Sequence, residues 1–348
     1  MKGTVVEQVG AEPKVVDYLE KPTPGPGQIL VKSLYAAMNP VDAFMVNMGM
    51  LVVEWPLVLA ADCSGVVVEA SPEAESKYNL KPGTYVCGCT RLGMKQYGAG
   101  QEYFLMDAQL AIPKPKSIDL IQAATLGAGL ETAALGIFQG LQVEMFNPDV
   151  QQDEKKSWMI VLGGGSNVGA AAIQILRAAG YRVLASCSER STGSVKALGA
   201  ETFDYKNSTE EQVAKVLETT EGNIAGIFDA AASNDPVVAK ELFKHESWKG
   251  ESKLFATTND WMSIGSWNGG QTYEIKLGGL GRPESKELNS LMEKYIPILA
   301  KLVENGKVKP LEYELVGDGG FEDIIKAYKH KAGGASGQRK IVVKVQDE

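Results

Sequence analysis

The residues with the clearest chemical potential form a glycine-rich segment, Gly164-Gly165-Ser166-Asn167-Val168-Gly169. It follows an apolar run at 158–162 that is typical of a buried strand, and it precedes an alanine-rich stretch with helical spacing. Glycines at a strand-to-helix turn let backbone amides approach a diphosphate, and the helix dipole favours the negative charge there. Ser166 replaces the middle glycine of this fingerprint. The position between strand and helix nevertheless predicts a dinucleotide-binding loop.

The residues after the next predicted strand indicate which dinucleotide binds. A carboxylate at this point binds the ribose diol of NAD, whereas neutral or cationic donors accept the 2′-phosphate of NADP. Ser188 and Arg190 are donors of that kind, and arginine forms charge-assisted hydrogen bonds to phosphate. Glu189 would favour NAD if it faced the ribose, although it also suits the solvated first turn of a helix. We therefore predict NADPH as the cofactor.

Alternating strand-like and helical runs surround these two loops. Such alternation predicts a parallel sheet covered by helices. Gly199 is a suitable stop for the helix that ends at Leu198, and Ser208 to Glu211 is a capping-box pattern. The expected strands are 158–162, 181–186, 201–205, 224–228 and 254–257, with a helix at 168–179.

The first third of the chain has a different pattern, in which proline and glycine turns separate short strands. The expected strands are 4–9, 29–35, 63–69 and 85–88. This pattern predicts a mostly β, barrel-like domain. The stretch 118–140 has helical spacing, and after Pro283 a long helix to Glu304 and a final strand at 340–345 are expected to return to the first domain.

Length and charge restrict the possible functions. A chain of 348 residues can bury a substantial core, and two domains are expected. The net charge is −8 and the cationic residues are scattered, which argues against nucleic-acid or anionic-membrane partners. No apolar run of signal-peptide or membrane-spanning length occurs, so a cytoplasmic location is expected.

The cysteines and histidines do not suit a metal site. The four cysteines, Cys63, Cys87, Cys89 and Cys187, are expected to be reduced thiols. The two histidines, His245 and His330, lie beside lysines in predicted helices. Zinc sites combine closely spaced cysteine, histidine and carboxylate ligands, and this set offers no such combination.

Several short motifs, in this order, resemble one known family. They are Asn39-Pro40-Val41-Asp42, Ala61–Val67, Lys81–Val86, Ala123–Leu126, Glu131-Thr132-Ala133, the glycine loop, Leu198-Gly199-Ala200, Phe203-Asp204-Tyr205, Gly281-Arg282-Pro283 and Ser336–Lys340. Over nearly the whole length, the chain resembles the medium-chain dehydrogenase/reductase superfamily. Within it, the chain is similar to the zinc-free quinone-reductase-like branch and to the fungal trans-acting enoyl reductases of polyketide biosynthesis.

The resemblance implies an α/β fold. A GroES-like β-barrel catalytic domain would comprise residues 1–126 and 281–348, and a Rossmann domain with a doubly wound parallel sheet would comprise 127–280. The family's zinc enzymes have Gly-His-Glu where this chain has Ala60-Ala61-Asp62, and their other catalytic zinc ligands are absent too. No metal is therefore expected.

The resemblance also assigns site residues. The expected cofactor contacts are Val41, Asp42, Ala43 and Phe44 beside the nicotinamide, Gly164, Gly165, Ser166, Asn167, Val168 and Gly169 at the diphosphate, Ser188, Glu189, Arg190, Ser191 and Tyr205 around the adenosine phosphate, and Thr257, Thr258, Ile341 and Val342 by their backbones. Thr132 is the polar catalytic candidate, although it also suits a helix-internal hydroxyl. The expected substrate contacts are Ala133, Ala134, Leu135, Ile137, Thr272, Tyr273, Glu274, Ile275 and Lys276, which also suit simple packing surfaces.

One departure affects the expected substrate. Related trans-acting enoyl reductases can have a lysine where this chain has Phe44. The main hypothesis is NADPH-dependent reduction of an α,β-unsaturated thioester or ketone, with a polyketide synthase as partner. The alternatives are a reductase of free quinones or enones, a non-catalytic NADPH-binding partner of a larger synthase, and a redox sensor. Fold analogy does not decide between them.

Overall fold

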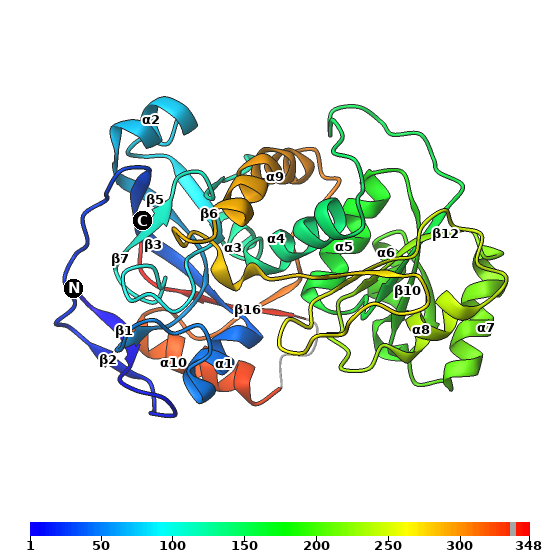
Figure 1. Ribbon diagram of the computed structural model, residues 1–348. Helices are drawn as coiled ribbons and strands as arrows, with labels where there is room; N and C mark the ends of the chain where they lie inside the picture. The colour runs from blue at the N-terminus through cyan, green and yellow to red at the C-terminus, as the bar shows by residue number, and fades with distance from the viewer. Residues whose placement is uncertain (335–338) are drawn as a thin grey trace. The chain divides into compact units, whose positions relative to one another are not determined.

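The computed structural model describes residues 1–334 and 339–348 (Figure 1). These residues form two compact units. The first unit contains residues 1–131, 277–304 and the described part of 310–348, and the second contains 132–276 and 305–309. Each unit has its own sheet or sheets. The fold is of the α/β class, with a β-rich first unit and a doubly wound parallel sheet in the second.

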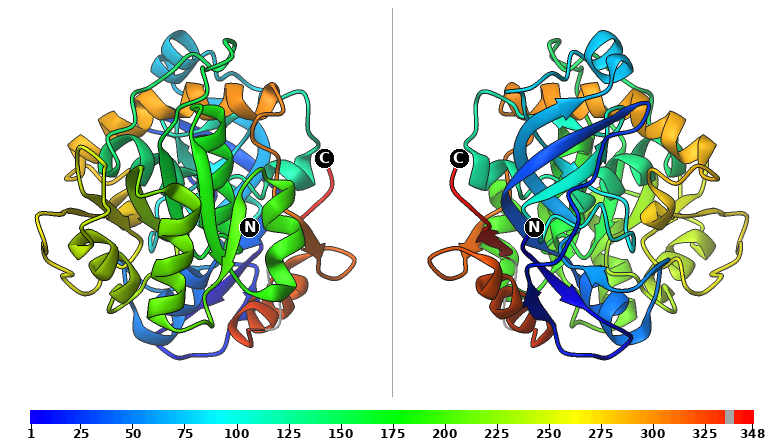
Figure 2. Two further views of the ribbon diagram at one scale, coloured as in Figure 1. Left: turned by 90° about the vertical axis from the view of Figure 1, so that its right-hand side faces the viewer. Right: turned by 90° about the vertical axis from the view of Figure 1, so that its left-hand side faces the viewer.

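The first unit is built mainly on antiparallel strands. They are β1 (Gly3–Val6), β2 (Lys14–Val16), β3 (Gln28–Met38), β4 (Leu57–Val58), β5 (Asp62–Ala70), β6 (Tyr85–Cys89), β7 (Tyr103–Asp107), β8 (Ile112–Pro113), β15 (Tyr313–Leu315) and β16 (Lys340–Lys344). The larger sheet has the order β15-β16-β3-β5-β6-β8, with β7 also paired to β3, and the smaller sheet has the order β2-β1-β4. Strands β3 and β5 run side by side in Figure 2.

Strand β16 is important for the site because it brings the end of the chain to the centre of this sheet. It pairs antiparallel with β3, with Ile341 opposite Met38 and Val342 opposite Ala37. Consecutive β-branched residues, from Ile341 to Val343, suit a strand that is buried on both faces, and residues 340 to 343 are all buried. Residues 303 and 305 positions apart in the sequence are therefore neighbours.

Helices cover the sheets of the first unit. They are α1 (Pro40–Met48), α2 (Pro72–Tyr78), α3 (Leu120–Ala123), α9 (Lys286–Glu304) and α10 (Phe321–Ala332), with a short 3₁₀ turn η3 (Leu277–Gly279). Helix α4 (Ala128–Leu135) begins in the first unit and ends in the second. Proline at the first position of α1 and α2 suits a helix start, because its missing amide would have no intrahelical partner.

The second unit contains a six-stranded sheet in which all strands are parallel. They are β9 (Trp158–Leu162), β10 (Arg182–Cys187), β11 (Glu201–Asp204), β12 (Ile224–Asp229), β13 (Leu254–Thr257) and β14 (Gln271–Glu274). The order is β11-β10-β9-β12-β13-β14. The order reverses between β9 and β12, and in doubly wound sheets ligands bind outside the carboxyl ends of the strands at such a point.

The helices of the second unit are α5 (Asn167–Ala178), α6 (Thr192–Ala197), α7 (Thr209–Thr220) and α8 (Val237–Lys244), with a π-helical turn η1 (Gly136–Gly140) and a 3₁₀ turn η2 (Glu189–Ser191). Helix α5 packs against β9 and β10 through its buried alanine and isoleucine face. The predicted capping box is present at α7, where Ser208 accepts from the Glu211 amide and Glu211 accepts from the Ser208 amide.

Two local predictions need correction. The stretch 118–140 is not one helix, because α3 and α4 are separate and a π-helical turn follows α4. His245 is not helical: it follows the last residue of α8 and has an extended backbone. His330 does lie in a helix, α10. Among the described residues, none of the helices is both long and apolar enough to cross a bilayer.

Candidate functional site

The glycine loop connects β9 to α5 in the second unit. Gly163 has a left-handed backbone, with φ of 79°, and donates its amide to Ser186 Oγ at 2.9 Å. The Gly164 amide donates to the Ser186 carbonyl at 2.8 Å. Ser166 caps α5, because its Oγ accepts from the Gly169 amide at 3.0 Å. The serine hydroxyl that replaces the middle glycine therefore has an internal partner.

Gly169 is needed for the close approach of helix and loop. A β-carbon at this position would lie 2.2 Å from the Gly163 carbonyl oxygen and 2.9 Å from Gly164 Cα. Both contacts are to backbone, which cannot move away without moving the loop. The last glycine of the motif thus has a packing role within the protein.

A cavity of about 320 Å³ lies beside this loop. It is lined by Leu162, Gly163, Ser186, Tyr205, Gln212, Ala231, Ser233, Asp235, Pro236, Val237 and Val238. The Gln212 amide group donates to the carbonyls of Tyr205 and Asn207, at 3.0 and 2.7 Å, and so holds the turn after β11. The cavity is at the carboxyl ends of β9, β10 and β12, where a doubly wound sheet binds ligands.

The turn after β10 carries four of the predicted cofactor residues. The hydroxyls of Ser188 and Ser191 are 2.8 Å apart, and Glu189 and Arg190 are exposed. Tyr205 is 52% exposed and lies in the wall of the cavity. These residues therefore lie on adjoining loops at one edge of the sheet. The side chains of Glu189 and Arg190 are exposed to solvent.

Asp229 was missed by the sequence reasoning, which ended the strand one residue earlier. Its fully buried carboxylate accepts from the amides of Ala231 and Ser233, at 3.0 and 2.9 Å, and from Thr257 Oγ1 at 3.0 Å. Thr258 donates to the Asp229 carbonyl. Burial raises the pKa of Asp229, and these hydrogen bonds oppose the shift. The available signal was an acidic residue directly after a buried strand.

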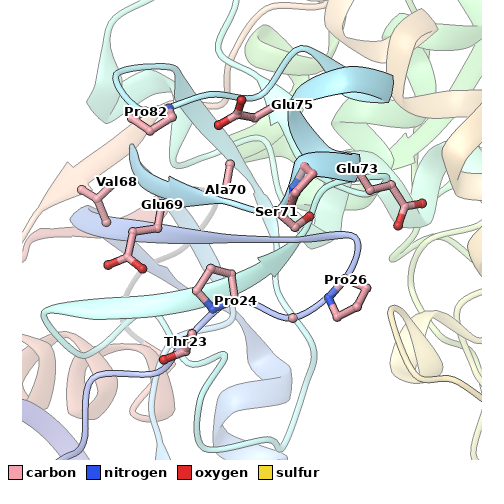
Figure 3. Close-up of a pocket in the computed structure, with 12 residues that line it drawn as sticks. Thr23, Pro24, Pro26, Val68, Glu69, Ala70, Ser71, Glu73, Glu75 and Pro82 are labelled. Carbon is pink, nitrogen blue, oxygen red and sulfur yellow. The ribbon is translucent and has the colours of Figure 1, made fainter.

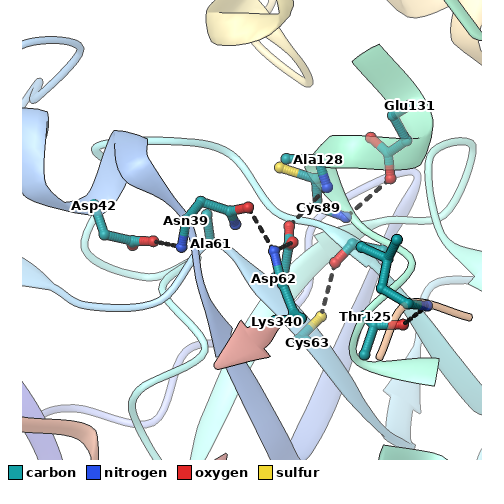
Figure 4. Close-up of polar contacts among 12 residues, drawn as sticks. Asn39, Asp42, Ala61, Asp62, Cys63, Cys89, Thr125, Ala128, Glu131 and Lys340 are labelled. Carbon is teal, nitrogen blue, oxygen red and sulfur yellow. Dashed lines mark hydrogen bonds and ion pairs between the residues drawn. The ribbon is translucent and has the colours of Figure 1, made fainter. Parts of the chain in front are cut away.

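A second cluster of polar side chains lies in the first unit, around the buried ion pair of Asp62 and Lys340 (Figure 4). Lys340 Nζ is 2.5 Å from Asp62 Oδ2 and 2.5 Å from Asn39 Oδ1. The other oxygen of Asp62 accepts from the Ala128 amide at 2.8 Å. The Lys340 and Asp62 side chains are 1% and 0% exposed. Sequence reasoning noted both positions within motifs but did not predict that they meet.

The predicted nicotinamide-side residues of α1 adjoin this ion pair. Asp42 is buried, and its Oδ2 accepts from the Asn39 amide at 2.7 Å. Burial raises the pKa of Asp42 to about 6. Val41 and Ala43 are half-buried, and Phe44 is 37% exposed.

Glu131, the residue before Thr132, is also fully buried. Its Oε1 accepts from the Cys89 amide at 2.9 Å, and its Oε2 has no hydrogen-bond partner among the residues described. Burial raises the pKa of Glu131 well above its usual range, and the Cys89 amide opposes the shift. Thr132 itself is half-buried.

The predicted substrate segments contact each other in the second unit. A β-carbon at Gly136 would lie 2.4 Å from Ile275 Cδ1, and one at Gly140 would lie 2.9 Å from Tyr273 Cδ1. The side chains of Ala133, Ala134, Leu135, Ile137 and Ile275 are buried. In contrast, Thr272, Tyr273, Glu274 and Lys276 line a surface hollow of about 380 Å³.

The remaining predicted residues are placed as follows. Ile341 and Val342 lie in β16, where they pair with β3, and both residues are fully buried. In the described part of the chain, no three histidine, cysteine or carboxylate side chains are arranged to hold a metal ion. The four cysteines are buried and form no disulfide. Of the terminal motif, Ser336, Gly337 and Gln338 lie outside the described residues.

A separate groove of about 780 Å³ lies in the first unit (Figure 3). It is lined by Thr23, Pro24, Gly25, Pro26, Val68, Glu69, Ala70, Ser71, Pro72, Glu73, Glu75 and Pro82. None of the predicted site residues belongs to it.

Comparisons with known proteins agree with this architecture. Residues 25–116 match the alcohol dehydrogenase GroES-like domain. The chain is 28% identical over 342 residues to trans-enoyl reductase poxP of Penicillium oxalicum, covering 92% of this chain and 87% of that protein. It is 33% identical over 241 residues to trans-enoyl reductase traG of Penicillium crustosum, covering 66% of this chain and 64% of that protein.

Solved structures with the same fold include an alcohol dehydrogenase superfamily protein from Novosphingobium aromaticivorans. Its TM-score is 0.79 and its sequence identity 25%, over 99% of this chain and 100% of that one. The JamJ enoyl reductase has a TM-score of 0.71 at 19% identity, over 99% and 100% of the two chains, which supports the fold alone. The chain is therefore similar in sequence and fold to the alcohol dehydrogenase superfamily of oxidoreductases and, in sequence, to fungal trans-enoyl reductases.

Proposed function

We propose that this protein is an NADPH-dependent reductase of α,β-unsaturated thioesters or ketones that acts in trans with a polyketide synthase. The observation that carries the proposal is the capped glycine loop, which opens onto a cavity at the carboxyl edge of a doubly wound sheet. The similarity to proteins named trans-enoyl reductases supports the reaction class.

In this proposal, the amides from Gly164 to Gly169 bind the diphosphate, and Ser188, Arg190 and Tyr205 bind the adenosine phosphate. Residues 127–280 form the dinucleotide-binding domain, and residues 1–126 with 281–348 form the catalytic domain. Val41 to Phe44, Thr257, Thr258, Ile341 and Val342 border the nicotinamide. The exposed guanidinium of Arg190 is available for a phosphate.

The bound cofactor supplies a hydride to the β-carbon of the substrate. The electron pair of the double bond then moves toward the carbonyl, whose oxygen becomes an enolate, and a proton from solvent is added at the α-carbon. Thr132 is proposed to donate a hydrogen bond to this oxygen. A donor placed where negative charge develops is effective because it interacts more strongly with the transition state than with the substrate.

Turnover of defined substrates tests this proposal. We expect purified protein to oxidise NADPH when the crotonic acid thioester of N-acetylcysteamine is added, measured as loss of NADPH absorbance with formation of the saturated thioester. Reactions without thioester and reactions with NADH are the controls. NADPH binding without thioester reduction would contradict the proposed reaction, and absence of NADPH binding would contradict the proposed cofactor.

A free quinone or enone is the second candidate substrate. The observation that favours it is Phe44, an apolar and 37% exposed side chain at a position where related enoyl reductases can have a lysine. The same assay with a simple quinone distinguishes the two. Rapid quinone reduction with no thioester reduction would establish the second candidate, and tight NADPH binding with neither activity would indicate a non-catalytic role.

A further inference from the structure

The ion pair of Asp62 and Lys340 connects segments that are distant in the sequence. Lys340 is the first residue of β16, Asp62 is the first residue of β5, and 278 positions separate them. Each charge has partners: Lys340 also donates to Asn39, and Asp62 also accepts from the Ala128 amide. A buried charge is tolerated only when paired and hydrogen-bonded in this way.

The partners of this ion pair adjoin three of the proposed nicotinamide-side segments. Asn39 directly precedes α1 and holds Asp42 through its backbone amide. Ala128 is the first residue of α4, which carries Thr132. Lys340 directly precedes Ile341 and Val342 in β16. One charged pair thus connects the starts of α1, α4 and β16.

The absence of a side chain at Gly127 leaves space for the Asp62 carboxylate beside the start of α4. A β-carbon at Gly127 would lie 2.1 Å from Asp62 Oδ1, so only glycine at this position lets the carboxylate reach the Ala128 amide. One turn later, Glu131 holds the same helix to the Cys89 amide. Helix α4 is therefore attached to β5 and β6 by two buried carboxyl groups just before Thr132.

We propose that Asp62 and Lys340 are positioning residues, which hold the starts of α1, α4 and β16 in the arrangement that hydride transfer requires. The inference rests on the proposed function for the role of these segments. Stability alone does not require the pair, because apolar residues of similar volume commonly replace a buried ion pair without loss of stability. Hydrogen bonds are directional and fix each segment at a defined atom.

Two variants and their combination separate positioning from stability. Lys340→Met leaves the Asp62 carboxylate buried without a positive partner, and Asp62→Asn leaves the Lys340 ammonium buried without a negative partner. We therefore expect the melting temperature of each single variant to be several degrees below that of the wild type. Asp62→Asn/Lys340→Met contains neither charge and retains an oxygen for the Ala128 amide. We expect it to recover most of the lost melting temperature.

The decisive result is whether activity recovers with stability. We expect the double variant to keep NADPH affinity within about threefold and to remain about 10–100-fold below the wild type in kcat, because small misplacements of reacting groups are costly. Recovery of kcat together with melting temperature would overturn the proposal. The matched control is Arg91→Met/Asp107→Asn, which removes another ion pair of the first unit, at 2.6 Å, and should leave kcat unchanged.

Amide hydrogen exchange provides a readout that does not depend on turnover. In the double variant, we expect faster exchange in the peptides that contain residues 39–44, 128–132 and 340–342, and unchanged exchange elsewhere. Wild-type exchange rates in all three peptides would overturn the positioning role, whatever the activity. A wild-type protein that neither binds NADPH nor reduces thioesters would contradict the proposed function, and the exchange result would still decide whether the pair orders these segments.

Discussion

At the scale of single residues, Arg190 is the side chain that most directly tests the proposed cofactor. It is exposed on the turn after β10, beside the Ser188 and Ser191 hydroxyl pair. A guanidinium there distinguishes NADPH from NADH because only NADPH has a 2′-phosphate. Glu189, on the same turn, has the charge that would favour the ribose diol.

Arg190→Ala should weaken NADPH binding by roughly 10–100-fold and leave NADH binding almost unchanged, since a hydrogen bond to a charged group contributes about 1.5–3 kcal/mol. Titration of the protein with each cofactor, followed by fluorescence, measures both dissociation constants. Glu189→Gln is the neighbouring control and should not weaken NADPH. An equal loss for both cofactors would show that Arg190 does not contact the 2′-phosphate.

Asp42 should give the folded protein a distinctive dependence on pH. Burial raises the pKa of Asp42 to about 6. The folded carboxyl therefore keeps its proton at pH values where the unfolded carboxyl has lost it, and stability falls as pH rises through this window. A shift from about 3.8 to about 6 corresponds to about 3 kcal/mol in the free energy of unfolding.

Asp42→Asn should remove this dependence, because an amide oxygen can still accept from the Asn39 amide and carries no charge. Urea unfolding at a series of pH values from about 4 to about 7 measures the effect. We expect the wild type to lose about 2–2.5 kcal/mol relative to the variant across that range. Parallel curves for the two proteins would contradict the assignment.

At the scale of elements, the junction of β9 and α5 has no room for an added methyl group at Gly169. Gly169→Ala would place a methyl group 2.2 Å from the Gly163 carbonyl oxygen. We expect α5 to shift, the melting temperature to fall and NADPH affinity to drop at least tenfold, since the loop amides would no longer converge.

Gly193→Ala is the matched control for that change. Gly193 is a helical glycine of the same unit, in α6, and a β-carbon there would have no atom within 4 Å. Alanine favours the helix over glycine by about 0.8–1.0 kcal/mol, so this variant should be as stable as the wild type or more stable. If Gly169→Ala bound NADPH as well as Gly193→Ala does, the glycine loop would not be the diphosphate site.

At the scale of the whole molecule, cofactor binding should appear as increased stability. A ligand that binds only the folded protein adds about 2.7 kcal/mol at a concentration one hundred times its dissociation constant. We expect NADPH to raise the melting temperature by several degrees in differential scanning calorimetry, and NADH at the same concentration to raise it less. Equal shifts would argue against NADPH as the preferred cofactor, and no shift would argue against a dinucleotide site.

Much of the second unit could be predicted from the sequence. The strands Trp158–Leu162 and Leu254–Thr257 occur with the predicted bounds, and the capping box at Ser208 is present. These features depend on residues close to one another in the chain, where composition and spacing are informative. The break between α3 and α4 was not predicted, because helical periodicity continues through it.

The sequence by itself determined the glycine loop, the alternation of strands and helices around it, and the resemblance to one superfamily. Only the tertiary structure decided that Lys340 meets Asp62 and Asn39, and that the Asp229 carboxylate holds Thr257. The physical reason is that the loop is a local backbone arrangement, whereas a buried charge finds its partner through strand pairing between distant segments. The position of β16 beside β3 brings Lys340 into the core of the first unit.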